Sequence, residues 1–160
     1  MSCEKNMKAD EIVRLFNELT YRRYLVNKDQ FQQILKGIRL QEYIALYHIS
    51  QQASANGVCD GKMYLEDLSR LMSMPMSNTS KMIRKLQEGG FVYWTHDGDG
   101  SNGTYAVIAK GGWELMKQQA EKAKTYYGAV LDKFGKDNMV ELIGLMKKLD
   151  EVLDDAQENM

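Results

Sequence analysis

Residues 76–88 read MSNTSKMIRKLQE, and this stretch decides the fold. Four of its residues recur at the i, i+3, i+4 and i+7 spacing of one helix face: Thr79, Met82, Ile83 and Leu86. The opposite face is cationic and rich in hydroxyl groups, with Ser77, Ser80, Lys81, Arg84 and Lys85. The pattern predicts an amphipathic helix whose polar face has the composition that contacts phosphates and base edges.

A second amphipathic helix is predicted directly before this one. Residues 65–72 read LEDLSRLM and place four apolar side chains inward, namely Leu65, Leu68, Leu71 and Met72. Pro75 cannot continue that helix, but it suits the first turn of the next one. Two helices joined by a short turn are therefore expected over residues 65–88.

A small β-hairpin is predicted after the second helix. Gly89 and Gly90 end the helix, since glycine accepts the left-handed cap geometry. Residues 91–95 and 104–108 are β-branched and aromatic, as strands are, and residues 62–64 are expected to supply a short third strand. Helix, turn, helix, strand, loop, strand is the order of a winged helix-turn-helix. We predict a mainly α fold with a small β wing.

Helical patterns flank this central part on both sides. Before it, residues 8–24 and 41–53 have apolar side chains at helical spacing, and residues 26–40 are predicted to form a short helical connector. After it, residues 110–134 carry a near-continuous apolar stripe. Asp137 is predicted to cap one further, C-terminal helix.

These flanking helices have more apolar surface than one winged domain can cover. We therefore expect a homodimer held together by both ends of the chain. The predicted organisation has three parts: an N-terminal dimerisation segment over 1–40, a winged lobe that contacts DNA over 41–110, and a C-terminal dimerisation segment over 111–160.

Residues 68–92, which end in LQEGGFV, resemble the DNA-reading part of the MarR (multiple antibiotic resistance regulator) transcription factors. The resemblance rests on pattern and spacing, and it extends over most of the chain because the flanking helices match that family's layout. It implies a dimer whose terminal helices intertwine. Each subunit would place one helix in a major groove, and the operator would be a near-palindrome with half-sites about one helical turn apart.

The resemblance also implies which residues contact double-stranded DNA: Ser77, Asn78, Ser80, Lys81, Arg84 and Lys85. The first three match small polar positions that the family uses on bases and phosphates. Lys81 and Arg84 project from the same face, and arginine can bind guanine through two parallel hydrogen bonds. The competing interpretation is an ordinary solvated helix face.

The wing departs from the family's pattern, in which an aspartate is followed two residues later by an arginine that enters the minor groove. Here Asp97 is followed by Gly98 and Asp99, and the hairpin has no Lys or Arg. Both carboxylates would be repelled by phosphate, and only His96 could become cationic, at mildly acidic pH. The sequence therefore predicts weak, salt-sensitive non-specific affinity.

The resemblance also implies a ligand site, since members of the MarR family bind small aromatic or phenolic molecules between the dimer helices and the winged lobe. The residues that could line such an effector site here are Tyr21, Tyr43, Tyr47, His48 and Trp113. A ligand there would bias the spacing of the two reading helices, which is a population shift. Aromatic residues at helical spacing also occur as ordinary core, so this alternative stays open.

Two cysteines, Cys3 and Cys59, do not form a disulfide framework. A thiol-based redox sensor is an alternative, but neither residue matches the family's sensing position in the first helix. Asp60 would raise the pKa of the Cys59 thiol. The cysteines and histidines have no metal-ligand spacing, so no metal is expected.

Other classes of function are disfavoured. The chain has no nucleophile elbow or phosphate loop, so we expect no enzyme activity and no cofactor. No apolar run approaches the roughly 20 residues of a membrane span, and the N-terminus lacks a signal-peptide core, which favours a cytoplasmic protein.

The net charge of −1 makes no electrostatic case for nucleic acid. The acidic wing and the neutral winged lobe make a winged-helix protein-interaction module that does not bind DNA the main alternative. Repression and activation both stay open.

Overall fold

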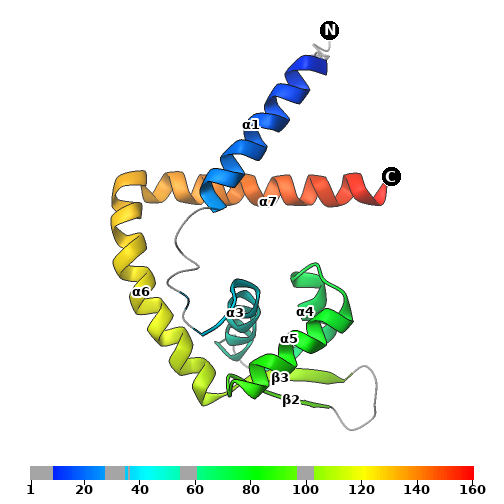
Figure 1. The fold of residues 1–160 in the computed structure, drawn as a ribbon, viewed down its shortest axis with the longest axis vertical. Coiled ribbons are helices and arrows are strands. Elements are labelled where there is room, and N and C mark those ends of the chain that lie inside the picture. The colour runs from blue at the N-terminus through cyan, green and yellow to red at the C-terminus, as the bar shows by residue number, and fades with distance from the viewer. Residues whose placement is uncertain (1–8, 28–34, 36, 55–60, 97–102) are drawn as a thin grey trace. The chain divides into compact units, whose positions relative to one another are not determined.

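The computed structural model describes residues 9–27, 35, 37–54, 61–96 and 103–160. Its helices and strands are, in chain order, α1 (Ala9–Asn27), α3 (Leu40–Ser54), β1 (Met63–Tyr64), α4 (Leu65–Leu71), α5 (Met76–Glu88), β2 (Val92–His96), β3 (Thr104–Ile108), α6 (Lys110–Phe134) and α7 (Lys136–Glu158) (Figure 1). The predicted mainly helical fold with a small sheet is confirmed. The chain divides into two compact units, Met1–Leu40 and Gln41–Met160.

The three strands form one antiparallel sheet in the order β1-β3-β2. Ala106 in the middle strand is paired with Met63 on one side and with Trp94 on the other. Because the side chains of directly paired residues lie on the same side of a sheet, these three residues share one face. That face is the one against which the helices of the lobe pack, since Met63 and Ala106 are both buried.

The strand predicted over 104–108 and the short strand predicted within 62–64 are confirmed. The strand predicted over 91–95 begins one residue later than expected. Phe91 belongs instead to the turn that ends α5, because its amide donates a hydrogen bond to the carbonyl of Leu86 at 2.9 Å.

The core of the second unit is shared by α3, α4, α5 and the sheet. Eight of its larger apolar side chains are at most 2% exposed: Leu46, Ile49, Met63, Leu65, Leu68, Ile83, Leu86 and Val92. Burying a side chain of this size contributes about 1.5–3 kcal/mol relative to leaving it in water. Within this core, α4 and β2 contact α5 directly and hold it in place.

The long helix predicted over 110–134 is confirmed, and it meets α7 at a bend (Figure 1). The predicted N-cap of α7 is wrong. The cap is Gly135, with φ of 94°, and Asp137 lies inside the first turn without capping it. Glycine adopts a positive φ without steric penalty, and this allows the chain to turn here. Asn138 Nδ2 donates to the carbonyl of Phe134 at 2.7 Å and so satisfies the end of α6.

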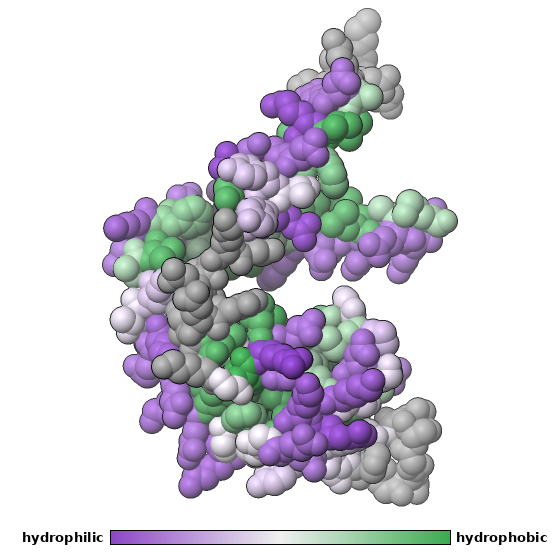
Figure 2. Space-filling view, viewed as in Figure 1, coloured by the Kyte–Doolittle hydropathy of each residue, from purple (hydrophilic) through white to green (hydrophobic). Residues whose placement is uncertain are grey.

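The two terminal helices have exposed apolar side chains. On α1, Ile12 and Phe16 are 51% and 65% exposed, and α7 has no buried residue at all. Figure 2 shows apolar and hydrophilic side chains along opposite edges of the C-terminal half of α7. Val140, Leu145 and Met146 on α7 are 60%, 58% and 61% exposed.

The connector predicted over 26–40 falls mostly outside the described residues, so its helix stays a prediction. In its last part, residues 35 and 37–39 are described and are not helical, so the prediction is wrong there; Leu35 and Ile38 are buried. In the described part of the chain, none of the helices combines the length and apolarity needed to cross a membrane.

Candidate nucleic-acid interface

Helix α5 packs on α4 and β2 through the four residues that its sequence pattern predicts. Thr79, Met82, Ile83 and Leu86 are all buried. The Thr79 hydroxyl donates to the carbonyl of Pro75 at 3.1 Å, which satisfies the one polar group of this stripe. The predicted inner face is confirmed, and burial of the stripe determines which side of α5 faces outward.

The outward side of α5 presents the six residues predicted to contact DNA. Five of them, Ser77, Asn78, Lys81, Arg84 and Lys85, are exposed, and Ser80 is half-buried. Three cations minus the single carboxylate of Glu88 give this helix a charge of +2, although the whole chain carries −1. This helix thus carries a local excess of positive charge, and DNA contact by these six residues stays a prediction.

A tight turn joins α4 to α5. Ser73 has φ of 49°, a left-handed conformation that costs a non-glycine residue about 1–2 kcal/mol. Hydrogen bonds hold it: Ser69 Oγ donates to the carbonyl of Met74 at 2.6 Å, and the Ser73 amide donates to the carbonyl of Arg70 at 3.1 Å. Pro75 follows as the N-cap of α5. These hydrogen bonds hold the turn and so help to set the angle between α4 and α5.

The C-terminal end of α5 is closed by a Schellman motif, as the glycine pair predicts. Gly90 has φ of 78°, and its amide donates to the carbonyl of Gln87 at 2.9 Å. The amide of Phe91 donates to Leu86, the second bond of the motif. The chain passes from this motif directly into β2, so α5 and β2 are connected by a short turn.

Two contacts join the outer part of α5 to β2. The guanidinium carbon of Arg84 lies over the ring of Trp94, 5.7 Å from its centroid. Gln87 Oε1 accepts a hydrogen bond from the backbone amide of Trp94 at 3.0 Å. Sequence reasoning assigned Trp94 only to a strand, because nothing local in the chain indicates which helix residue it meets.

The tip of the wing, including Asp97 and Asp99, lies outside the described residues. Cys3 and Cys59 also lie outside them, so a thiol role stays a prediction. Among the residues that are described, no three His, Cys, Asp or Glu side chains are grouped so that they could hold a metal ion.

The aromatic residues predicted to line an effector site are distributed over three helices. Tyr43, Tyr47 and His48 lie on α3, where the Tyr47 and His48 rings are 5.4 Å apart. Burial raises the pKa of the Tyr43 phenol, and neighbouring Tyr47 adds to this rise. Trp113 on α6 is 44% exposed, and Tyr21 on α1 belongs to the other compact unit. An effector site formed by these residues stays a prediction.

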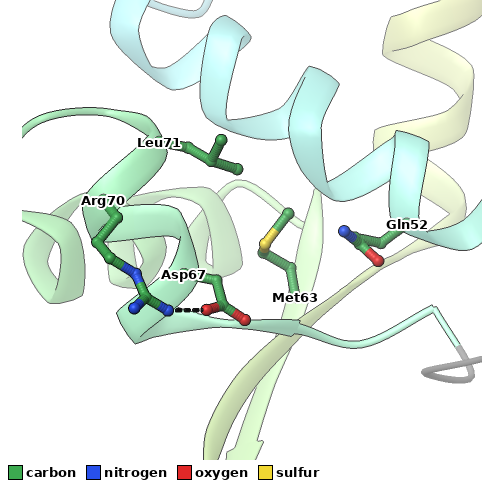
Figure 3. A pocket seen from close by; sticks show the side chains of 5 residues that line it. All are labelled: Gln52, Met63, Asp67, Arg70 and Leu71. Atoms are coloured by element: carbon green, nitrogen blue, oxygen red, sulfur yellow. Dashed lines mark hydrogen bonds and ion pairs between the residues drawn. The ribbon is translucent and has the colours of Figure 1, made fainter.

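A cavity of about 390 Å³ lies elsewhere, between α3, β1 and α4 (Figure 3). Its lining residues are Gln52, Met63, Asp67, Arg70 and Leu71. Arg70 and Asp67 form an ion pair with one another, so the charge of the cation is already balanced. None of the five predicted aromatic residues lines this cavity. Sequence reasoning missed it because three separate elements supply its walls.

Comparison with known proteins gives no match to a protein-family model or to a curated protein. Solved structures, however, share the fold. AbsC, a MarR family transcriptional regulator from Streptomyces coelicolor, is 19% identical with a TM-score of 0.66, and the match covers 93% of this chain and 97% of AbsC. Staphylococcus aureus MarR, in complex with salicylate and kanamycin, is 18% identical with a TM-score of 0.65, over 92% of this chain and 95% of that one.

A third structure is Sco3205, a MarR family transcriptional regulator from Streptomyces coelicolor in complex with DNA. It is 17% identical with a TM-score of 0.71, and the match covers 92% of this chain and 93% of Sco3205. In each case the similarity extends over nearly the whole of both chains. Together with the helix-turn-helix and its hairpin, these similarities identify the fold of this chain as that of the MarR family of transcriptional regulators.

Proposed function

We propose that the protein is a homodimeric transcription regulator that binds duplex DNA, with α5 of each subunit in a major groove. The observation that carries the proposal is the outer face of α5, where exposed hydroxyl, amide and cationic side chains gather on the second helix of a braced helix-turn-helix. The structure of Sco3205 in complex with DNA supports it, since that protein has the same fold.

The proposal gives each part of α5 a role. Arg84 would bind a guanine edge through two parallel hydrogen bonds, which supplies sequence preference. Lys81 and Lys85 would neutralise phosphates, which supplies affinity without sequence preference. No side chain caps the first turn of α5. The positive end of the helix dipole, beside Ser77 and Asn78, would then favour a phosphate.

The homodimer is part of the proposal, because the apolar side chains of α1 and α7 are exposed in a single chain. A second copy related by a two-fold axis would bury them and would place two reading helices on a near-palindromic site. A protein that reads DNA must share its compartment with DNA. We therefore also propose a cytoplasmic location.

We further propose modulation by a small aromatic effector. The structure of Staphylococcus aureus MarR in complex with salicylate supports this for the fold. Here the effector would contact aromatic residues such as Tyr43, Tyr47 and Trp113 and would shift the population between two spacings of the reading helices. We propose no catalytic step.

The test is a fluorescence-anisotropy titration of the purified protein against duplex from its own upstream region, at low and at moderate salt. A scrambled duplex of equal composition is the control. The proposal predicts saturable binding that prefers the upstream sequence and weakens with salt, because counterions are released. Equal affinity for both duplexes, or no binding at low salt, contradicts it.

The second candidate is a protein-interaction module built on the same fold. The observation that favours it is the absence of Lys and Arg from residues 95–107, the wing and its flanks, which hold Asp97 and Asp99 instead. Phosphate would repel such a hairpin. The titration separates the two candidates, since an interaction module would not bind duplex even at low salt.

A further inference from the structure

Arg84 is the only cation of α5 with a ring contact among the described residues, and its partner lies on a different element. The guanidinium carbon is 5.7 Å from the centroid of the Trp94 ring. Arginine is normally a flexible side chain that loses several rotamers when it binds. A ring beneath the guanidinium limits those rotamers before any ligand arrives.

The position of Trp94 on β2 is fixed by its strand and by α5. Trp94 shares the inner face of β2 with Val92, which is 1% exposed, whereas Tyr93 between them points to the other face and is 66% exposed. The Trp94 backbone amide donates to Gln87 Oε1 on α5, and its strand partner is Ala106. The backbone that carries the ring is therefore joined to the same helix that carries Arg84.

A contact over the face of a ring leaves the hydrogen-bonding groups of the guanidinium available. Arginine has five N–H donors that lie in the guanidinium plane. The attraction to an aromatic face comes from the charge and uses none of them, and tryptophan is the strongest such partner. The ring can thus orient Arg84 while two parallel N–H groups remain able to donate to a base edge.

We propose that Trp94 is a positioning residue for DNA recognition, whose ring holds the guanidinium of Arg84 in the orientation that contacts DNA. This inference rests on the proposed function and adds a specificity-determining residue that lies outside the recognition helix. Residues 95–107 hold no Lys or Arg. The first strand of the wing would then contribute to recognition indirectly, through the arginine of α5.

The experiment is a double-mutant cycle measured by anisotropy on the upstream duplex. Its variants are Trp94→Leu, which removes the ring, Trp94→Phe, which keeps an aromatic face, Arg84→Ala and the double variant. Tyr93→Leu is the matched control, since it makes the same kind of change one residue away on the opposite face. Thermal unfolding followed by circular dichroism checks that each variant is folded.

We expect Trp94→Leu to weaken binding roughly two- to fivefold, the size of an exposed cation–π contact. Trp94→Phe should recover most of this loss, and Tyr93→Leu should bind like the original protein. In the Arg84→Ala background, Trp94→Leu should have no further effect, because the group that it positions is already gone. A merely structural role would instead weaken binding equally in both backgrounds, and that result overturns the proposal.

A second measurement, tryptophan fluorescence, detects the contact between Arg84 and Trp94 in the absence of DNA. In a Trp113→Phe background, Trp94 is the only tryptophan. Arg84→Ala should then change the emission of Trp94, whereas Lys124→Ala on α6 should leave it unchanged. An unchanged emission with Arg84→Ala contradicts the contact.

If the original protein binds no duplex at low salt, the proposed function fails together with this inference. If it binds but Trp94→Leu binds equally well, only the inference fails.

Discussion

The backbone amide of Ala109 donates a hydrogen bond to the carbonyl of Phe91 at 2.9 Å. Ala109 is the N-cap of α6, and Phe91 is the residue that completes the turn after α5. The start of α6 and the end of α5 are thus joined through the backbone. Because a backbone bond tolerates little displacement, the close approach depends on the glycines at the start of α6.

Gly112→Ala tests this junction. A Cβ at Gly112 would lie 2.3 Å from the Phe91 carbonyl oxygen and 2.7 Å from Ile108 Cγ1, so backbone must shift to admit it. We expect the free energy of unfolding to fall by about 1–3 kcal/mol, the usual cost of overpacking. Urea denaturation followed by circular dichroism measures it.

The control for that substitution is Gly128→Ala, later in the same helix, where an added Cβ meets nothing within 4 Å. It should raise stability by up to about 1 kcal/mol, because alanine favours helix over glycine. If the two variants unfold at the same urea concentration, α6 does not approach Phe91 closely.

Arg84→Ala tests the assignment of base contact to the outer face of α5. Loss of a bidentate contact to guanine should weaken binding of the upstream duplex by roughly 1–3 kcal/mol and relax the preference over a scrambled duplex. Lys124→Ala, at an exposed cation of α6, is the control. If the affinity of the Arg84→Ala protein is undiminished, Arg84 does not contact the DNA.

Lys81→Ala tests phosphate contact. A lysine that neutralises one phosphate should affect all sequences alike, so upstream and scrambled duplexes should both bind more weakly. The slope of log affinity against log salt should fall in magnitude by about 1. Anisotropy titrations at four salt concentrations give the slope. A variant whose affinity falls only on the upstream duplex would show that Lys81 reads bases instead.

The α7 surface is expected to form the dimer interface. Met146 is 61% exposed on the apolar side of this helix. Met146→Glu would place a charge in a buried interface, so sedimentation equilibrium should show a shift from dimer to monomer. Lys147→Glu introduces the same residue one position away at a polar site and should remain dimeric. A monomeric original protein, or a dimeric Met146→Glu variant, argues against this interface.

Tyr43 should make stability sensitive to alkaline pH. Burial raises the pKa of its phenol above the ordinary value of 10.0, with Tyr47 adding to the rise. The folded state therefore holds the proton more tightly than the unfolded state. The associated stability is complete below about pH 10 and is lost as the pH rises through the folded pKa.

Tyr43→Phe has no proton to lose, so its stability should decline less steeply above pH 10. Urea denaturation from about pH 8 to about pH 11 gives the comparison, with Tyr93→Phe at an exposed tyrosine as the control. Parallel declines for Tyr43→Phe and the original protein would mean that this phenol has no linked effect.

Local patterns were sufficient to predict the helix boundaries of α5 and α6 and the position of β3. The helical period of the apolar residues is enough to place Met82 and Leu86 on the buried side of α5. Gly90 ends the helix because glycine readily adopts the left-handed conformation. The exception, Asp137, illustrates the limit of such rules. Its side chain could cap a helix, but the neighbouring Gly135 adopts a conformation at φ of 94° that starts α7 two residues earlier.

What the sequence by itself determined was where the helices and strands lie, to within a few residues at their ends, and which side of α5 is apolar, because both depend on neighbours within a few positions along the chain. What only the tertiary structure decided was which elements meet. The contact of Arg84 with Trp94 and the approach of Gly112 to Phe91 join residues on different elements. Such contacts depend on the packing of α5, β2 and α6 around a shared core, and the spacing of residues along the chain does not specify that packing.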